Sequence, residues 1–302
     1  MVFAVGICGF VAGSELLVRF VVAPGDGYER YKAEFSSAQA PIAAFGDSHV
    51  ADGLESSKEF VNLGTASETL FLMLAKARSY AASGRGKKIV LQYAPEQFAI
   101  YRIANQQADI AEELLAGNMR WLEFMRPHFR GYLLAYWNAA LRDPARIFAA
   151  FANSAPSTES EPQPADSSGL AALSPSEQRK AAQIRVQLHA PLPQGRTVEA
   201  LVEKFAEVLR EFRQQGIETC IVEYPLSSPY RESAAQAPTF EAMSKRFVRL
   251  AGAENVRFVD LAAAMPDSAF GDPDHIAAHA RRTVTGLVLD GCFGADRSAA
   301  PQ

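Results

Sequence analysis

The chain has few cysteines and little net charge, and each shortage argues against a class of protein. Its 302 residues include Cys8, Cys220 and Cys292, with no C-x-x-C spacing, which argues against a disulfide-rich framework or a cysteine zinc site. A bridge between Cys220 and Cys292 stays open, because it requires an oxidising compartment and a geometry that spacing does not reveal. The net charge of -4, with no basic run longer than two residues, argues against a nucleic-acid partner.

The rest of the composition is that of a globular protein. Hydrophobic residues make up 48% and charged residues 21% of the chain, which is enough apolar material for a buried core. A length of 302 residues allows one large domain or two small ones.

The N-terminus is the exception, because it is apolar almost without interruption up to Pro24. Only Glu15 and Arg19 break the run, and their spacing of four lets them pair on one face of a helix. Such a stretch is long enough to span a bilayer, and it lacks a basic leader and a clear cleavage site. We therefore expect an uncleaved signal anchor over residues 1–24 and a linker over 25–39. An amphipathic helix packed on the domain or at an interface is the alternative.

Short apolar runs alternate with helical patterns along the rest of the chain. Alternation of this kind predicts a parallel sheet covered by helices on both faces, with active groups at the carboxyl ends of the strands. The predicted strands are 41–45, 59–63, 88–93, 217–224 and 256–261, and the predicted helices are 66–82, 197–215, 240–250 and 275–289.

Two segments interrupt this pattern. Residues 102–153 are helical in pattern and rich in aromatic side chains, so we expect a helical insertion that serves either core packing or substrate binding. Residues 154–180 begin with a Ser-, Pro- and acid-rich stretch and predict a disordered loop. Residues 294–302 are expected to form a flexible tail.

Two short motifs carry candidate chemistry. Ser48 lies in Gly-Asp-Ser-His directly after the first predicted strand, where a serine side chain is exposed next to free backbone N–H groups. Asp272 precedes His275 by three residues, a spacing that lets the carboxylate orient the imidazole. Taken singly, each motif is equally consistent with a tight turn or a helix cap formed by an Asp or Ser side chain.

Together, in this order, the motifs resemble the SGNH (GDSL-like) hydrolase superfamily. Its first block matches at Ser48, its glycine block at Gly64 after the second strand, and its D-x-x-H block at Asp272 and His275. The resemblance implies a three-layer α/β sandwich over residues 40–293. It also implies a triad of Ser48, His275 and Asp272, with an oxyanion hole formed by the N–H groups of Ser48 and Gly64.

The Gly-x-Asn-Asp block of that family is absent. The third strand runs instead into Tyr93-Ala-Pro-Glu-Gln97, which removes the family's side-chain oxyanion donor, and Gln97 is the available substitute. Loss of one such donor costs about 3 kcal/mol of transition-state stabilisation. Asp47, His49, Asn62 and Tyr93 are further candidates for lining the site.

The apolar N-terminus, His49 after the serine and the missing block are similar to one branch of the superfamily, the cell-surface polysaccharide O-acetyltransferases such as those of alginate. The resemblance implies acyl transfer or ester hydrolysis on a polysaccharide outside the cytoplasmic membrane, without a cofactor. It further implies a single-pass, periplasm-facing protein that works with an acyl donor and a multispanning acyltransferase. The alternative is a non-catalytic glycan-binding or scaffold protein of the same fold.

A metal site is the remaining chemical alternative. His275 and His279 are four residues apart on the predicted last helix and could share a metal ion. The pattern lacks the glutamate of H-E-x-x-H, so we expect His279 to face solvent and no metal to be bound.

Overall fold

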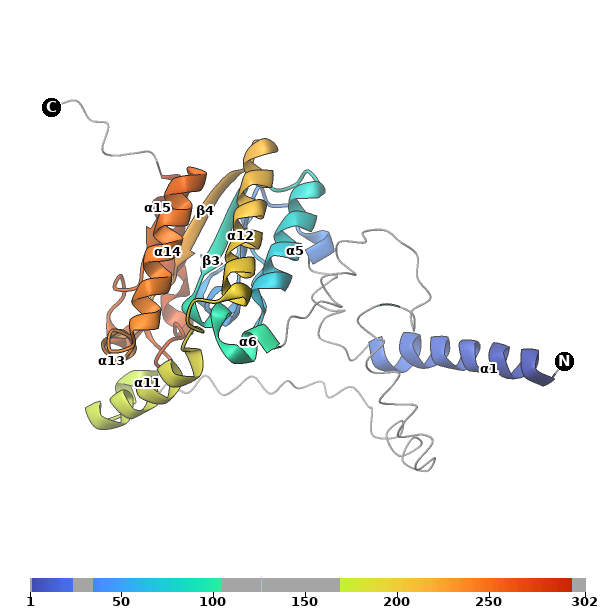
Figure 1. Ribbon diagram of the computed structural model, residues 1–302, viewed down its shortest axis with the longest axis horizontal. Helices are drawn as coiled ribbons and strands as arrows, with labels where there is room; N and C mark the ends of the chain where they lie inside the picture. Colours follow the sequence, from blue (N-terminus) through green and yellow to red (C-terminus); the bar gives the residue numbers. More distant parts are fainter. Residues whose placement is uncertain (1, 24–34, 105–125, 127–168, 295–302) are drawn as a thin grey trace. The chain divides into compact units, whose positions relative to one another are not determined.

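The computed structural model describes residues 2–23, 35–104, 126 and 169–294 (Figure 1). The chain divides into two compact units, one made of residues 1–38 and 108–164 and the other of residues 39–107 and 165–302. The second unit contains Ser48, Gly64, Asp272 and His275.

A parallel five-stranded sheet forms the centre of this unit, as the alternating pattern predicts. The strands lie in the order β2-β1-β3-β4-β5, so the first strand of the chain is flanked by the second and third. Register pairs Phe45 with Leu91 and Tyr93 with Glu223, which brings the carboxyl ends of the central strands to one edge. The strands are β1 Ile42–Phe45, β2 Phe60–Asn62, β3 Lys88–Tyr93, β4 Glu218–Glu223 and β5 Arg257–Asp260.

Helices cover both faces of the sheet and make three layers. On one face, α5 (Leu70–Ala82), α12 (Arg196–Gln214) and α14 (Pro238–Glu254) pack side by side (Figure 1). On the other face, α4 (Ser48–Gly53) packs against α15 (Arg281–Phe293). Side chains alternate accordingly, because Phe45 contacts Tyr80 of α5 while its neighbour Ala44 belongs to the core under α15.

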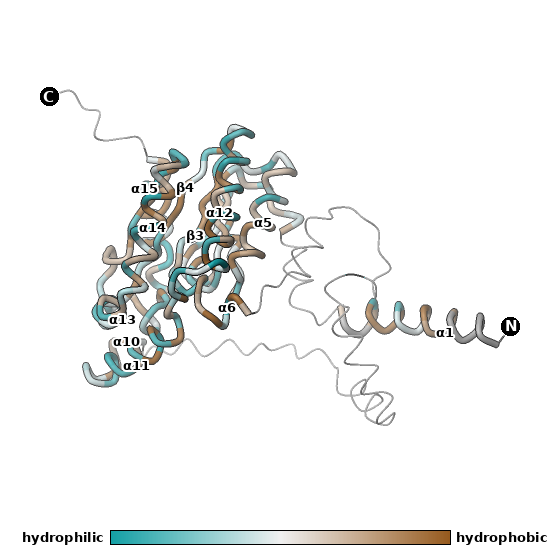
Figure 2. The backbone as a smooth tube through the Cα atoms, in the orientation of Figure 1, coloured by the Kyte–Doolittle hydropathy of each residue, from teal (hydrophilic) through white to brown (hydrophobic). Residues whose placement is uncertain are grey.

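Helix α12 shows how the sequence produces this layering. Its buried residues recur at helical spacing, and the tube of Figure 2 alternates between brown and teal along this helix. The helix ends just before Gly216, whose φ of +70° is the left-handed conformation expected of a glycine at a helix C-terminus.

The loop predicted over 154–180 is wrong in its second part, because residues from Gly169 onward form helices α10 (Gly169–Ala172) and α11 (Pro175–His189). Ser174 and Glu177 form a capping box at the start of α11, with Pro175 in the first turn. Buried Leu170 and the bond from Gln178 Nε2 to its carbonyl, at 2.9 Å, fix α10 to α11. Capping chemistry therefore outweighs the polar composition here.

The helix predicted over 275–289 is also wrong at its start, since α15 begins only at Arg281. Residues 275–277 pair instead with residues 269–271: Phe270 and Ile276 form an antiparallel bridge, and Gly271 N donates to His275 O at 2.9 Å. His275 therefore lies on a short hairpin-like loop rather than on a helix.

The remaining described elements are short. They are η2 Pro95–Phe98, α6 Ile100–Ala104, α13 Ser228–Ala234, η4 Asp267–Ala269 and η5 Ala278–Ala280. Most of the predicted linker at 25–39 and of the predicted insertion at 102–153 lies outside the described residues, as do residues 154–168 and the tail from 295.

At the N-terminus, helix α1 (Val2–Leu17) continues into a π-helical turn, η1 (Val18–Val22). Arg19 Nη2 donates to Glu15 Oε1 at 2.7 Å, which is the pairing expected from their spacing. Within the described residues, no helix combines the length and the apolar character needed to cross a membrane, so the membrane anchor predicted over 1–24 is not found.

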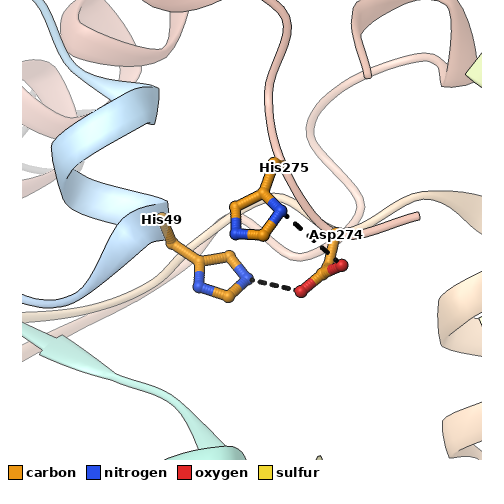
Figure 3. A group of neighbouring side chains, drawn as sticks. All are labelled: His49, Asp274 and His275. Carbon is orange, nitrogen blue, oxygen red and sulfur yellow. Dashed lines mark ion pairs between the residues drawn. The ribbon is translucent and has the colours of Figure 1, made fainter. Parts of the chain in front are cut away.

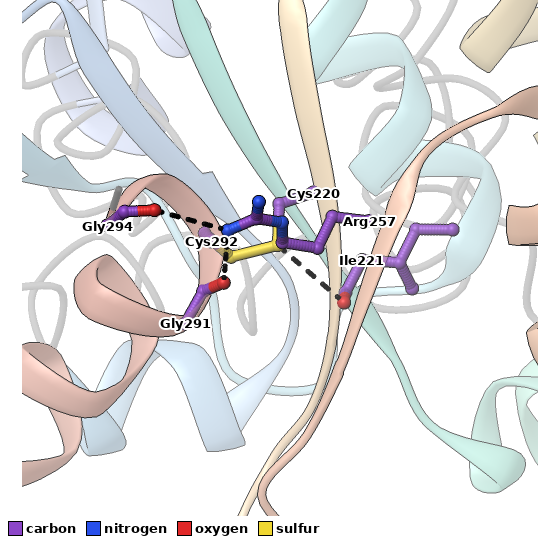
Figure 4. The surroundings of a disulfide bond; sticks show 6 residues. All are labelled: Cys220, Ile221, Arg257, Gly291, Cys292 and Gly294. Atoms are coloured by element: carbon purple, nitrogen blue, oxygen red, sulfur yellow. Dashed lines mark hydrogen bonds between the residues drawn. A yellow bond between two sulfur atoms is a disulfide. The ribbon is translucent and has the colours of Figure 1, made fainter. Parts of the chain in front are cut away.

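A disulfide joins the sheet to the helical layer beneath it. Cys220 of β4 is bonded to Cys292 of α15, with their Cα atoms 5.6 Å apart (Figure 4). Next to it, Arg257 Nη1 donates to the carbonyl of Gly291 at 3.1 Å. The bridge that the spacing left open is thus formed, and it ties α15 to β4.

Candidate active site

Ser48 begins helix α4 immediately beyond the carboxyl end of β1. Two glycines allow the close packing of this turn: a Cβ on Gly46 would collide with Gln92 and Val50, and one on Gly64 would come within 2.6 Å of Ala51 N. As the first residue of the helix, Ser48 has a backbone N–H without an intrahelical acceptor. The strand-to-helix turn therefore presents a hydroxyl and a donor at the same point.

The structure brings Ser48, His275 and Asp272 into a hydrogen-bonded line. His275 Nε2 lies 2.7 Å from Ser48 Oγ, and His275 Nδ1 lies 2.8 Å from Asp272 Oδ2. With Nδ1–H donating to the carboxylate, Nε2 is left to accept the serine proton. The serine and histidine are 227 residues apart in sequence, so the fold alone assembles this contact.

Asp272 is suited to remain ionised in this line. Its Oδ1 accepts the backbone N–H of Asp274 at 3.0 Å and that of His275 at 2.8 Å. Burial alone would raise the pKa of Asp272, but the hydrogen bonds and the neighbouring His275 hold it well below its usual range. The carboxylate is thus fixed in place by its own loop.

The two further donors expected for an oxyanion hole are already engaged. Gly64 N donates to Asn62 Oδ1 at 3.0 Å. Gln97 Nε2 donates to Asp47 Oδ2 at 3.1 Å and to the carbonyl of Glu68 at 3.2 Å. Gln97 is therefore not a substitute for the missing asparagine, and Gly64 can serve only by sharing or leaving Asn62.

Two more predicted lining residues have structural contacts instead. Asn62 Nδ2 donates to the carbonyls of Val50 (2.8 Å) and Leu54 (3.0 Å), which terminates α4. Tyr93 is buried, and its ring stacks on that of Phe247 at 4.5 Å between centroids. Tyr93 belongs to the core under α14 rather than to the site.

The residues on either side of Ser48 in the chain, Asp47 and His49, belong to a set of charged side chains that solvent scarcely reaches. We call it the buried charged cluster; it consists of Asp47, His49, Glu96, Arg102 and Asp274. Asp47 is its centre and accepts hydrogen bonds from Gln92 Nε2 at 2.9 Å and Arg102 Nη2 at 3.3 Å. Burial alone would raise the pKa of Asp47, but His49 and Arg102 hold it well below its usual range.

His49 and Asp274 connect this cluster to the candidate triad. His49 Nε2 lies 3.5 Å from Asp274 Oδ2, and the rings of His49 and His275 stack with centroids 5.0 Å apart (Figure 3). Asp274 also forms an ion pair with Arg185 Nε of α11 at 2.9 Å, and the same guanidinium reaches Asp272 at 3.4 Å. Asp274 is thus a buried carboxylate that contacts both the ring of His49 and the guanidinium of Arg185.

The metal alternative from the sequence does not fit this arrangement. His279 is exposed on η5, and His275 precedes it on the loop, so the two do not share a helix face. Two groups of the described residues are compact enough to hold an ion, but one uses His275, whose nitrogens both have partners, and the other surrounds Asp47, which Arg102 already contacts.

Sequence reasoning missed Arg185, Glu96 and Arg102. No motif marks them, and helix α11, which carries Arg185, falls partly in the segment expected to be a loop. Gln92 gave a usable signal, since it is a polar residue inside an apolar run predicted to be a buried strand. A polar side chain in such a strand must find partners, and its amide here supports Asp47.

Comparison with known proteins gives a limited result. No family model and no curated protein matches the chain. A solved structure described as "a putative acylhydrolase" from Bacteroides fragilis aligns with 87% of this chain and 94% of its own, at 8% identity and a TM-score of 0.46. A likeness at this level says nothing about function, so the functional proposal rests on the geometry of the site.

Proposed function

We propose that this protein is a serine-dependent acyl-ester hydrolase or acyltransferase. The observation that carries the proposal is the hydrogen-bonded line from Ser48 Oγ through His275 to Asp272, with distances of 2.7 and 2.8 Å. A hydroxyl, an imidazole and an ionised carboxylate in this order are the parts of a nucleophilic serine site.

In the proposed reaction each of the three side chains has its own step. Ser48 Oγ attacks the acyl carbonyl while its proton passes to His275 Nε2. That proton then goes to the departing alkoxide oxygen, leaving the acyl group esterified to Ser48. Asp272 orients the ring and stabilises the imidazolium. Water or a sugar hydroxyl next attacks the acyl-serine, gives its proton to His275, and Ser48 recovers that proton as it leaves.

Stabilisation of the oxyanion is the weaker part of the site. The N–H of Ser48 is directed by the start of α4, while Gly64 N must turn from Asn62 Oδ1 to help. With no amide replacing the family's asparagine, we expect slow turnover of simple esters. This shortfall is the feature that favours a non-catalytic, glycan-binding role as the second candidate.

For the substrate, we propose an O-acyl group on a polysaccharide outside the cytoplasm. The support is the resemblance to the O-acetylating branch together with the Cys220–Cys292 disulfide, since such bridges persist in oxidising compartments. Two assays test this: release of acetate from an acetylated polymer, and transfer of acetate to a deacetylated one. Acetylated monosaccharides serve as the control substrates.

The basic experiment is hydrolysis of p-nitrophenyl acetate by the full chain beside Ser48→Ala and His275→Ala. The matched control is the exposed neighbour His279→Ala, which should keep wild-type turnover. Loss of turnover in the first two variants alone supports the proposal. Equal behaviour of all four proteins would contradict it and would favour glycan binding, measurable by calorimetry with the same polymers.

A further inference from the structure

His49 is in a position that the proposed reaction does not explain. It follows Ser48 directly, yet its side chain points inward, is 5% exposed and contacts no part of the Ser48 hydroxyl line except the ring of His275. A buried histidine usually avoids charge, because burial favours the neutral ring. The groups around His49 reverse that preference.

Both ring nitrogens of His49 face carboxylate oxygens. Nδ1 lies 2.9 Å from Asp47 Oδ1 and 3.3 Å from Glu96 Oε1, and Nε2 lies 3.5 Å from Asp274 Oδ2. A neutral imidazole has one N–H and would turn a lone pair toward one of these carboxylates, whereas an imidazolium donates at both nitrogens. Glu96 Oε1 has no hydrogen-bond partner within the described residues, and its ion pair is with the ring of His49.

The pKa directions agree with this geometry. Burial alone would lower the pKa of His49, but Asp47, Asp274 and Glu96 hold it well above its usual value. The pKa of His189, which also lies near Asp274, is shifted in the opposite direction, because burial lowers it to about 4. Its Nδ1 is 3.8 Å from Asp274 Oδ2 and 3.0 Å from the hydroxyl of Tyr230. Asp274 thus lies between two imidazoles whose pKa values are shifted in opposite directions.

The ring of His275 lies over the charged one. Their centroids are 5.0 Å apart and their planes differ by 28°, which is a stacked contact (Figure 3). A positive charge at this distance opposes a second one on the neighbouring ring.

We propose that His49 is a positioning residue of the candidate triad, an imidazolium held among the carboxyl groups of Asp47, Glu96 and Asp274 that supports the stacked ring of His275 and opposes a second positive charge there. The inference rests on the proposed function, since it assigns His49 a role in that reaction. It also assigns a function to the buried charged cluster, which would otherwise be an unexplained concentration of charge beneath a surface site.

Other charged groups around the two rings have to be counted. They come from several elements: Asp47 at the start of α4, Glu96 on η2, Arg102 on α6, Arg185 and His189 on α11, and Asp272 and Asp274 on the loop. Arg185 adds a second positive charge on Asp274, so this carboxylate does not cancel His49 alone. Burial raises the pKa of Glu96 to about 7, so this carboxyl group titrates within the pH range in which kcat/KM would be measured.

The test compares the acidic limb of the kcat/KM profile for p-nitrophenyl acetate in wild type, His49→Gln and His189→Gln. Each substitution replaces an imidazole next to Asp274 by an amide, but only the first removes a charge. We expect His49→Gln to move the midpoint of the limb upward by about one pH unit, and His189→Gln to leave it in place. The same comparison in a Glu96→Gln background removes the titration of Glu96.

A second measurement covers the case in which His49→Gln fails to fold. In the 15N spectrum of the wild-type histidine rings, His49 should keep two protonated nitrogens at about pH 8, well above the ordinary titration range of a histidine side chain. A neutral His49 at about pH 7, or an unshifted limb in folded His49→Gln, would overturn the inference. If wild type and Ser48→Ala hydrolyse equally, it is the proposed function that fails, which is a distinguishable result.

Discussion

Two layers of polar groups lie one above the other at the carboxyl edge of the sheet, and they are built differently. The outer layer, Ser48, His275 and Asp272, is partly open to solvent and linked in a single line. The inner layer is the buried charged cluster, in which Asp47, His49 and Asp274 each contact more than one other charged group. An open line can accept a substrate and pass a proton, whereas a closed network can hold a geometry and a charge.

The two layers also differ in how far the sequence reveals them. The outer layer was predictable, because its residues lie in two short motifs, one directly after β1 and the other on the loop before α15. The inner layer was not, because Arg102 and Glu96 belong to no motif and acquire meaning only when η2 and α6 close over Asp47. Propensity and period predicted the five strands of the sheet, since each has apolar residues at its centre and lies between turn-forming residues.

The two errors in the predicted helices, at the starts of α11 and α15, are errors of local pattern. The start of α15 was misplaced because residues 275–277 pair with 269–271, a contact that local pattern cannot show. The capping box at Ser174 and Glu177 was readable as S-x-x-E but was obscured by the polar segment before it.

The largest expected effect is on catalytic activity, when a residue of the outer layer is removed. His275→Ala should lower kcat by about a thousandfold or more, because neither nucleophile activation nor proton return survives. Its melting temperature should change little, since the ring is at the rim. Burst kinetics and thermal melts on the same sample measure both. A large drop in melting temperature would show that the outer layer also holds the fold.

Breaking the inner layer should act mainly on stability. Asp47→Ala removes the acceptor shared by Gln92, Gln97, Arg102 and His49, and should cost about 3–5 kcal/mol of unfolding free energy, as for a broken buried ion pair. Urea unfolding measures the loss. Asp52→Ala, on the exposed face of α4, is the matched control and should stay near wild type.

A substitution at Gln97 tests whether this residue supports the inner layer or donates to the oxyanion. Because its amide donates to Asp47 and Glu68, Gln97→Leu should cost about 1–3 kcal/mol of stability and change kcat by less than the roughly hundredfold expected of a lost oxyanion donor. Unfolding curves and steady-state rates separate the two effects. A fall in kcat of about a hundredfold without loss of stability would return Gln97 to the oxyanion hole.

A smaller effect concerns the pH dependence of stability, through Glu223 at the end of β4. Burial, with Asp260 opposite in the register, raises the pKa of Glu223 to about 8. The unfolded chain ionises this group at lower pH than the folded one, so its contribution to stability is lost as pH rises from about 4.5 to about 8. Glu223→Gln should flatten this decline by on the order of 1 kcal/mol in melts between about pH 5 and pH 8. An unchanged slope would show that Glu223 titrates normally.

The central claim, that Ser48 is a nucleophile activated by His275, is tested most directly by covalent labelling. The full chain is treated with a fluorophosphonate, an electrophile that captures activated serines, and the peptides are analysed by mass spectrometry. The account predicts one adduct, on Ser48, which disappears in His275→Ala while His279→Ala is labelled like wild type. No adduct on Ser48, or equal labelling of His275→Ala, would contradict it.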